Sequence, residues 1–322
     1  MSKMKVSVCI ITYNHARFIG QALESALMQK TNFDYEIVIG EDCSTDNTGL
    51  ICKKYAEMYP DKIRLLQNDK NLGVIENFKR TLYACKGEYV ALLEGDDYWT
   101  DELKLQKQVD FLESNRDYAV VFHNAEILIE KTGEKYIGYS DEATKPFMFK
   151  TPNPTTTLQE IAAGNYIYTA TSLFRNNLYN KLPTWFSSEL PAADWPLHVI
   201  NAHYGKIFFM DEVMAVYRIH NLGVWSSMNH IELLEKTAKL YEIIYEHLKI
   251  KSTLVPLVLF YRQLLKYYVG ERDVKKNLYY YIKLLLRDPF NTIKWSVSSA
   301  LKICHRHLNL NVRIIRFTSN KN

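Results

Sequence analysis

The sequence predicts an α/β fold in which helices flank a mainly parallel, mixed sheet, and an all-helical region that follows it. Two observations predict this class. In the first third of the chain, short runs of β-branched and apolar residues alternate with segments of helical periodicity, as in parallel sheets joined by helices. From Ile231 onward only helical periodicity remains. We place the boundary near Asn229, with the sheet domain at 1–229 and the helical region at 230–322.

The composition narrows the class of protein. With 322 residues, 47% hydrophobic and 24% charged, the chain is long enough for a large core and is neither disordered nor collagen-like. The 40 Lys and Arg exceed the 36 Asp and Glu by only four, so the charge gives no indication of nucleic-acid binding. Five cysteines without a Cys-x-x-Cys pair argue against a disulfide framework and are most simply thiols in a reducing compartment. No apolar run suits a signal peptide or a membrane span, so we expect a cytoplasmic protein, soluble or peripheral on the inner face of the membrane.

The elements of the first half follow from apolar runs and helix signals. Residues 6–12 are mostly apolar and β-branched, which is typical of a buried strand. A helix is expected to begin at Asp46, as its N-cap, and to end near Tyr59 because Pro60 follows. The other expected helices are 18–29, 75–85 and 103–112, and the other expected strands are 36–40, 63–66, 89–93 and 119–129.

The second half of the chain is less regular. Residues 133–154 carry Gly, Pro and Thr without periodicity, so we expect a loop or an irregular edge there. Thr157 and Glu160 have the spacing of a capping box before a short helix. The later elements are expected as a strand at 169–174, a helix at 195–204, a closing hairpin of 207–210 and 213–219, and helices at 231–248, 254–268, 276–286 and 293–308.

Acidic residues follow two of the expected strands. Asp42 comes after the second strand, and the segment Glu94-Gly95-Asp96-Asp97 comes after the fourth. Open α/β sheets bind ligands at the carboxyl ends of their strands. Because unpaired buried carboxylates are costly, such a cluster needs solvent, an ion or a hydroxyl-rich ligand. These residues alone leave open the alternative of helix caps and solvated acids.

The order of the motifs is more specific than any one of them. Thr12-Tyr13-Asn14 follows the first strand, then come Glu41-Asp42-x-Ser44-Thr45-Asp46, Asn71-Leu72-Gly73, and Gly87-Glu88-Tyr89 leading into Leu92-Leu93-Glu94-Gly95-Asp96-Asp97. In this order, over about the first hundred residues and more weakly to Asn221, the chain resembles the family 2 glycosyltransferases of the GT-A fold, of the type that builds bacterial surface glycans. The resemblance implies transfer of a sugar from a nucleoside-diphosphate sugar, UDP or dTDP favoured, to a hydroxyl of a glycan or lipid-linked saccharide acceptor. It further implies an inverting, non-processive, metal-dependent reaction in capsule, O-antigen or exopolysaccharide synthesis.

The resemblance also implies roles for individual residues. Asp194 is the expected catalytic base, and Asp96 and His220 are expected to approach a Mn²⁺ or Mg²⁺ ion. Glu94 departs from the family, which more often has Asp there, and Ala193 stands where the family usually has Glu. The residues expected to bind the nucleotide are Thr12, Tyr13, Asn14, Asp42, Glu94 and Arg218.

Some of these residues have plainer interpretations. Asp194 could be an N-cap of the helix that it opens, and His220 could be a structural histidine. Arg218 and His220, two apart on an expected strand, would share a face that suits a diphosphate. Tyr98, Trp99 and Trp195 are candidates to contact the acceptor sugar, or else are core residues.

The C-terminal segment is electrostatically distinct. From Glu271 onward there are 11 Lys and Arg against 3 Asp and Glu, and apolar positions are interleaved with the cationic ones up to Phe317. This pattern suits a peripheral helix on an anionic membrane surface or, equally, a solvated basic face packed on the transferase.

The competing functional hypothesis is a catalytically degenerate GT-A domain that binds only a nucleotide or a protein. The departures at Glu94 and Ala193 favour it, whereas the retained carboxylates argue against it. A dinucleotide-binding Gly-x-Gly-x-x-Gly and a P-loop are both absent from the sequence. So are the Gln-x-x-Arg-Trp element and the membrane helices of processive synthases.

Overall fold

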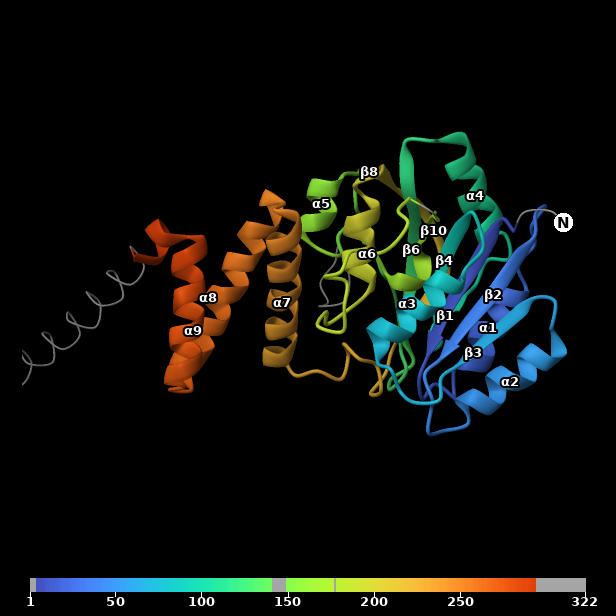
Figure 1. The fold of residues 1–322 in the computed structure, drawn as a ribbon, viewed down its shortest axis with the longest axis horizontal. Coiled ribbons are helices and arrows are strands. Elements are labelled where there is room, and N and C mark those ends of the chain that lie inside the picture. The colour runs from blue at the N-terminus through green and yellow to red at the C-terminus, as the bar shows by residue number, and fades with distance from the viewer. Residues whose placement is uncertain (1–3, 141–148, 177, 294–322) are drawn as a thin grey trace, which may run out of the picture. The chain divides into compact units, whose positions relative to one another are not determined.

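The computed structural model describes residues 4–140, 149–176 and 178–293 (Figure 1). Contacts within the chain define two compact units, which divide between Thr253 and Leu254. Helix α7 (His230–Leu248) therefore belongs to the first unit, although the sequence analysis grouped it with the C-terminal helices.

The first unit is built on a ten-stranded mixed sheet. Its main strand order is β3-β2-β1-β4-β9-β6-β10-β5, with β7 paired to β6 and β8 paired to β10. The long strands pair in parallel, and every antiparallel pair includes one of the short strands β5, β7, β8 or β9. The strands are β1 (Val6–Thr12), β2 (Tyr35–Glu41), β3 (Ile63–Gln67), β4 (Tyr89–Glu94), β5 (Tyr98–Trp99), β6 (Tyr118–Ile129), β7 (Glu134–Ile137), β8 (Thr155–Thr156), β9 (Leu173–Arg175) and β10 (Lys206–Ile219).

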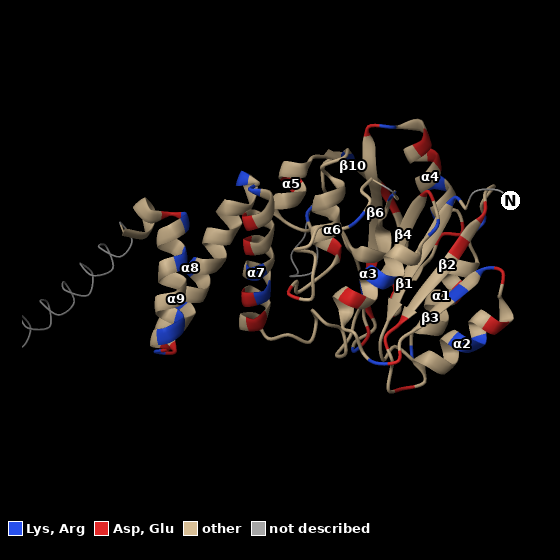
Figure 2. Ribbon diagram, in the orientation of Figure 1, with Lys and Arg blue, Asp and Glu red and all other residues tan. Residues whose placement is uncertain are grey.

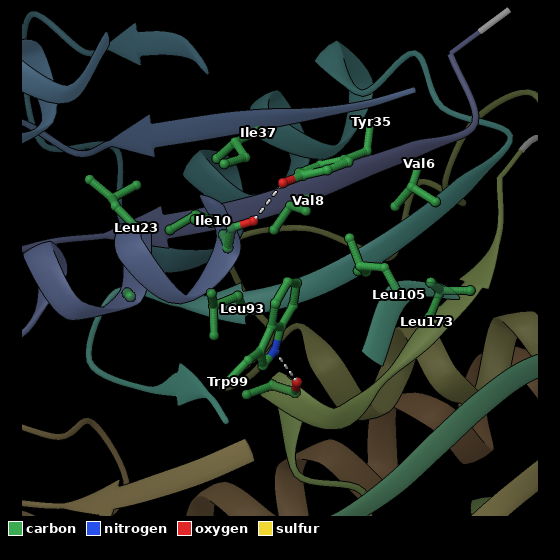
Figure 3. Packing of buried hydrophobic residues seen from close by; sticks show 14 of the residues in the cluster. Val6, Val8, Ile10, Leu23, Tyr35, Ile37, Leu93, Trp99, Leu105 and Leu173 are labelled. Atoms are coloured by element: carbon green, nitrogen blue, oxygen red, sulfur yellow. Dashed lines mark hydrogen bonds between the residues drawn. The ribbon is translucent and has the colours of Figure 1, made fainter. Parts of the chain in front are cut away.

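Helices complete the first unit. They are α1 (Ile19–Leu27), α2 (Thr48–Met58), α3 (Val74–Ala84), α4 (Lys104–Ser114), α5 (Leu158–Ala163), α6 (Asp194–Asn201) and α7, with 3₁₀ turns η1 (Thr169–Thr171) and η2 (Lys251–Thr253). Both faces of β1 and β2 are buried, which explains why most residues of these strands are apolar and do not alternate regularly with polar ones. Figure 3 shows Val8, Ile10 and Ile37 of these strands in the core.

The expected elements before residue 130 are confirmed, with ends that differ by a few residues at most. Asp46 accepts hydrogen bonds from the backbone N–H and the hydroxyl of Thr48, although the N-cap position itself is Asn47. The capping box of Thr157 and Glu160 is also confirmed.

Three expectations in the second half are corrected. The hairpin expected at 207–210 and 213–219 is a single strand, β10, which pairs in parallel with β6. Asp211 and Glu212, between the two expected strands, do not form a turn; the register of the pairing shifts there, between Met210 and Val213. The region 133–154 includes the strand β7, which pairs with the end of β6. The strand expected at 169–174 is the turn η1 followed by the short strand β9.

The described part of the second unit contains the helices α8 (Leu254–Gly270) and α9 (Val274–Arg287), and residues 289–293 after α9 are also helical. Helices α8 and α9 contact each other, and the rings of Tyr268 and Tyr280 stack with their centroids 5.8 Å apart. The helix expected at 293–308 lies outside the described residues, apart from its first position. Among the residues that the structure describes, no helix has both the length and the apolarity to cross a bilayer.

Candidate active site

The loops after β1 and β2 are tied together at the carboxyl edge of the sheet. Asn14 adopts a left-handed backbone conformation, with φ of 56°, which asparagine tolerates better than most residues. Its backbone N–H donates to Ser44 Oγ over 3.0 Å, and its Oδ1 accepts from the backbone N–H of Thr45 over 2.8 Å. Asn14 therefore joins the first two motifs, next to the buried Thr12 and to Tyr13, which is 40% exposed.

Asp42 organises the loop before α3. Its Oδ1 accepts from Asn68 Nδ2 and from the backbone N–H of Leu72, each over 2.8 Å, and its Oδ2 accepts from the N–H of Gly73 over 3.0 Å. These contacts explain why the Asn71-Leu72-Gly73 motif accompanies this acid. A carboxylate can accept about four hydrogen bonds, so one further donor can be accommodated.

The acidic segment after β4 brings three carboxyl groups together. Glu94, Asp96 and Asp97 each offer an oxygen, and these oxygens lie within 4.8 Å of one another. Gly95 makes the tight turn possible, because a Cβ at this position would lie 2.4 Å from Thr12 Oγ1 and 2.9 Å from His15 Nδ1. The turn is thus packed directly against the loop that follows β1.

The three carboxyl groups differ electrostatically. Burial, followed by the charges of Asp96 and Asp194, raises the pKa of Glu94 to about 8. Burial likewise raises the pKa of Asp97 well above its ordinary value. Burial opposes ionisation of Asp96 too, but the hydrogen bond from His220 and the nearby ring of His15 outweigh it, so the pKa of Asp96 lies below its ordinary value.

These residues fit a divalent cation. Asp97 Oδ1 accepts the backbone N–H of Arg218 over 2.8 Å, whereas its Oδ2 is buried and lacks a hydrogen-bond partner among the described residues. An orphaned carboxylate oxygen beside two further carboxylates is the donor set that hard cations such as Mg²⁺ and Mn²⁺ prefer.

Two histidines contact Asp96. His220 Nε2 lies 3.0 Å from Asp96 Oδ2, and His15 Nε2 lies 3.7 Å from the same oxygen. The two rings meet edge to face with their centroids 6.3 Å apart, and burial lowers the pKa of His15. His15 was not among the predicted site residues, because its only signal in the sequence is its position three residues after Thr12.

Arg218 reaches the site but turns its guanidinium toward the protein. Its Nε donates to Glu130 over 2.9 Å, and its two terminal nitrogens donate to the backbone oxygen of Asp96 and to Gln21, each over 2.5 Å. The guanidinium carbon also lies 4.4 Å from the ring centroid of Tyr98, which is half-buried. Arg218 thus fixes the acidic turn from behind, instead of sharing an open cationic face with His220.

Asp194 lies in the first turn of α6, whose N-cap is Ala193. Its Oδ2 accepts from Asn165 Nδ2 over 3.1 Å and lies 3.5 Å from Thr169 Oγ1. Burial raises the pKa of Asp194. Because the charge of Asp194 also raises the pKa of Glu94, the two carboxyl groups interact electrostatically.

The two tryptophans are core residues, which corrects the expectation that they contact an acceptor. Trp99 is 2% exposed and donates its Nε1–H to the backbone oxygen of Ala170 over 2.8 Å (Figure 3). Trp195 is 3% exposed and donates its Nε1–H to the backbone oxygen of Ile161 over 2.7 Å. Buried indoles with a satisfied N–H have no edge or face left for a sugar.

The α/β fold, with Asp42 at the carboxyl end of β2 and the acidic cluster at the carboxyl end of β4, has the arrangement expected from the motifs for an α/β transferase. A profile of glycosyl transferase family 2 matches residues 7–181. Since this match covers more than half of the chain, the protein belongs to glycosyl transferase family 2.

Related sequences agree with this assignment. The chain is 37% identical over 223 residues to an uncharacterised protein of Mycobacterium tuberculosis. This alignment covers 69% of this chain and 61% of that protein. It is 31% identical over 237 residues to an uncharacterised glycosyltransferase of Nostoc, covering 73% of this chain and 70% of the relative. The chain thus spans 61% of the length of its mycobacterial relative.

Solved structures confirm the GT-A fold. Residues 1–349 of Staphylococcus aureus TarS, in complex with UDP-GlcNAc, align with a TM-score of 0.54 and 20% identity, covering 89% of this chain and 92% of that one. The mannosyltransferase PcManGT from Pyrobaculum calidifontis, in complex with GDP-Man and Mn²⁺, aligns with a TM-score of 0.55 and 16% identity, covering 96% of this chain and 88% of that one.

Proposed function

We propose that the protein is an inverting, metal-dependent glycosyltransferase that adds single sugars from a nucleoside-diphosphate sugar to a hydroxyl of a glycan or lipid-linked acceptor, in the synthesis of a bacterial surface polysaccharide. The observation that carries the proposal is the cluster of Glu94, Asp96 and Asp97 at the carboxyl end of β4, whose oxygens lie within 4.8 Å of one another, in a member of glycosyl transferase family 2. This cluster would hold the leaving diphosphate through a cation, and Asp194, whose charge raises the pKa of Glu94, would be the base for the acceptor.

The nucleotide would bind over the ends of β1 and β2. Tyr13 offers an exposed ring, and Thr12 and Asn14 shape the loop beneath it. Asp42 has capacity for one more donor, which matches a single N–H of a uracil or thymine base. TarS binds UDP-GlcNAc and PcManGT binds GDP-Man, which supports a nucleotide-sugar donor in general, and we favour UDP or dTDP.

The diphosphate would lie over the acidic segment. Glu94, Asp96 and Asp97 would hold a Mn²⁺ or Mg²⁺ ion, with His220 beside them, and a bound cation supplies charge neutralisation for a departing diphosphate. Arg218 would act indirectly, because its hydrogen bond to the backbone oxygen of Asp96 orients the turn.

Asp194 would act on the acceptor. Its carboxylate accepts the proton of the acceptor hydroxyl while that oxygen forms a bond to the anomeric carbon. The bond from the anomeric carbon to the phosphate oxygen breaks on the opposite face, and the diphosphate departs with the electron pair, so the configuration inverts. A carboxylate with a raised pKa is a stronger base than an exposed aspartate, which suits this step.

The first test is nucleotide binding. Melting temperatures would be measured with UDP, dTDP and GDP, each with and without Mn²⁺, because a ligand that binds only the folded state raises the melting temperature. We expect a metal-dependent rise with one nucleotide, which Asp96→Ala abolishes. No rise with any nucleotide would favour the degenerate, binding-module alternative.

The second test concerns the base. Asp194→Asn removes the proton acceptor and keeps the shape of the side chain, so nucleotide binding should persist while sugar transfer is lost. Full activity in this variant would contradict the assigned role of Asp194.

We further propose that the helices of the second unit attach the enzyme to an anionic membrane surface. Residues 254–293 carry seven Lys and Arg against three Asp and Glu, and Figure 2 marks these charges on α8 and α9. An exposed apolar row runs along α9 at intervals of four residues, formed by Val274, Leu278, Ile282 and Leu286, which are 46–77% exposed. An apolar row between cationic side chains is typical of helices that lie in the headgroup layer.

Vesicle sedimentation tests this attachment. The wild-type protein should sediment with phosphatidylglycerol vesicles and not with phosphatidylcholine vesicles. The double substitution Leu278→Ser with Ile282→Ser should lower the bound fraction severalfold, whereas Leu50→Ser, at a 69% exposed leucine of α2, should not. Equal sedimentation of the three proteins would contradict a role for α9.

A further inference from the structure

Two side chains contact Asp194, and we call them the cradle: Asn165, which lies between α5 and η1, and Thr169, the first residue of η1. Both side chains direct a polar group at the same carboxylate oxygen, Asp194 Oδ2, at 3.1 Å and 3.5 Å. Both residues are half-buried, so they lie at the rim of the site and not in the core. Their positions in the sequence, 29 and 25 residues before Asp194, give no hint of this contact.

The orientation of the Asn165 amide is fixed by the backbone two residues further along the chain. Its Oδ1 accepts the N–H of Ile167 over 3.1 Å, which is the geometry of an Asx turn. The amide nitrogen must therefore face Asp194, and it can only donate. Asn165 thus always presents a hydrogen-bond donor to Asp194. This hydrogen bond holds one oxygen of the Asp194 carboxylate in place and restricts the rotation of the carboxylate.

The turn η1 is anchored from the core side. Trp99 Nε1 donates to the backbone oxygen of Ala170 over 2.8 Å, and Gln108 Nε2 donates to the backbone oxygen of Thr171 over 2.9 Å. Gln108 is itself held by the buried ammonium of Lys104 over 2.8 Å. Donors on β5 and α4 thus fix the backbone of the two residues that follow Thr169, as pre-organised sites require.

The Thr169 hydroxyl approaches the same carboxylate oxygen as the Asn165 amide. It lies 3.5 Å from Asp194 Oδ2, against 3.1 Å for Asn165 Nδ2. A hydroxyl has one proton to donate, and an amide nitrogen can only donate, so both groups favour the ionised carboxylate. Two donors on one oxygen restrict the rotation of the Asp194 carboxylate.

We propose that Asn165 and Thr169 are positioning residues for Asp194, whose carboxylate they orient toward the acceptor hydroxyl by holding one of its oxygens. This inference rests on the proposed function, because it assumes that Asp194 is the base. It predicts that loss of either side chain lowers turnover, and that loss of Asn165 has the larger effect, since its contact with Asp194 is the shorter one.

The experiment measures release of nucleoside diphosphate from UDP-GlcNAc, or from GDP-mannose if the melting screen selects GDP, with water as the acceptor. Asn165→Leu should lower kcat by roughly 10- to 100-fold, the value of one hydrogen bond to a charged group, with KM and melting temperature close to wild type. Asn153→Leu, at an exposed asparagine outside the site, is the matched control and should leave kcat unchanged. Wild-type kcat in Asn165→Leu would overturn the role of Asn165.

A double substitution separates positioning from general damage. In an Asp194→Asn background, Asn165→Leu should cause no further loss, because the group that it orients no longer accepts a proton. An additional loss of the same size as in the wild-type background would show a merely structural role and overturn the proposal. Full activity of Asp194→Asn alone would instead contradict the proposed function, so the two failures are distinguishable.

The Thr169 hydroxyl has its own comparison. Thr169→Val removes the hydroxyl at constant shape and should lower kcat while leaving the affinity for the nucleotide with Mn²⁺ unchanged, whereas Thr169→Ser should restore kcat. Thr237→Val, on α7, is the matched control, because that hydroxyl bonds only within its own helix, to the backbone oxygen of Leu233. Equal losses in the Ser and Val variants of Thr169 would overturn the role of its hydroxyl.

Discussion

His198 makes the stability of the protein depend on pH through the helix that carries Asp194. It lies one turn after Asp194 on α6, is fully buried, and neither ring nitrogen has a hydrogen-bond partner among the described residues. Burial lowers the pKa of His198 from 6.5 to about 3. The neutral ring is therefore the form that the folded protein tolerates.

The sign and size of the effect follow from that shift. Between pH 6.5 and 3 the unfolded chain binds a proton that the folded chain does not, so the stability from this residue is complete above pH 6.5 and falls as the pH falls. At about 1.4 kcal/mol per pH unit, lowering the pH from 7.5 to 5.0 should cost about 2 kcal/mol of unfolding free energy from this residue alone.

Urea denaturation at the two pH values measures this contribution. His198→Leu replaces the ring by an apolar side chain of similar size, so at pH 7.5 the variant should be at least as stable as the wild type. Between pH 7.5 and 5.0 the variant should lose about 2 kcal/mol less than the wild type does. An identical loss in both proteins would refute the argument that His198 is held neutral by burial.

Two further predictions concern the packing around the site. Gly95→Ala should destabilise the protein by about 1–3 kcal/mol and weaken Mn²⁺-dependent nucleotide binding, because the added Cβ would lie 2.4 Å from Thr12 Oγ1. Urea denaturation measures the first effect, and calorimetry with UDP and Mn²⁺ measures the second. Wild-type values in both experiments would contradict the turn geometry. Lys104 is fully buried with Gln108 as its hydrogen-bond partner, and burial lowers the pKa of Lys104 well below its ordinary value. Lys104→Met should therefore stabilise the fold by about 1 kcal/mol or more in urea denaturation at pH 7.5. A clear loss of stability in this variant would contradict the prediction.

The sheet was predictable where the sequence carries a local signal. The largely apolar sequences of β1 and β2 predict buried parallel strands, because the faces of such strands are both covered. The strand β10 was mistaken for a hairpin because Asp211 and Glu212 interrupt its apolar pattern as a turn would. In the folded chain this interruption is a register shift against β6, which depends on a partner strand that is remote in sequence.

The site was predictable in its acids and not in their partners. The carboxylates of Asp42, Asp96 and Asp194 stand after or before recognisable elements, so their motifs could be read. His15 and Asn165 contact these acids only because the loops after β1 and α5 reach the same edge of the sheet. The direction of a side chain is equally hidden, as Arg218 shows by turning its guanidinium to Glu130 and Gln21.

The acidic segment illustrates why a site of this kind works against the stability of its own fold. Burial raises the pKa of Glu94 and of Asp97, and one oxygen of Asp97 has no hydrogen-bond partner among the described residues. Arg218 and the glycine turn hold the segment in place without neutralising it, because the guanidinium is already paired with Glu130. Binding of a divalent cation should therefore raise the melting temperature even without nucleotide. Asp97→Asn removes one of the crowded charges, so it should reduce that rise. Without metal, the variant should be at least as stable as the wild type. A larger rise with Mn²⁺ in Asp97→Asn than in the wild type would contradict this account of the segment.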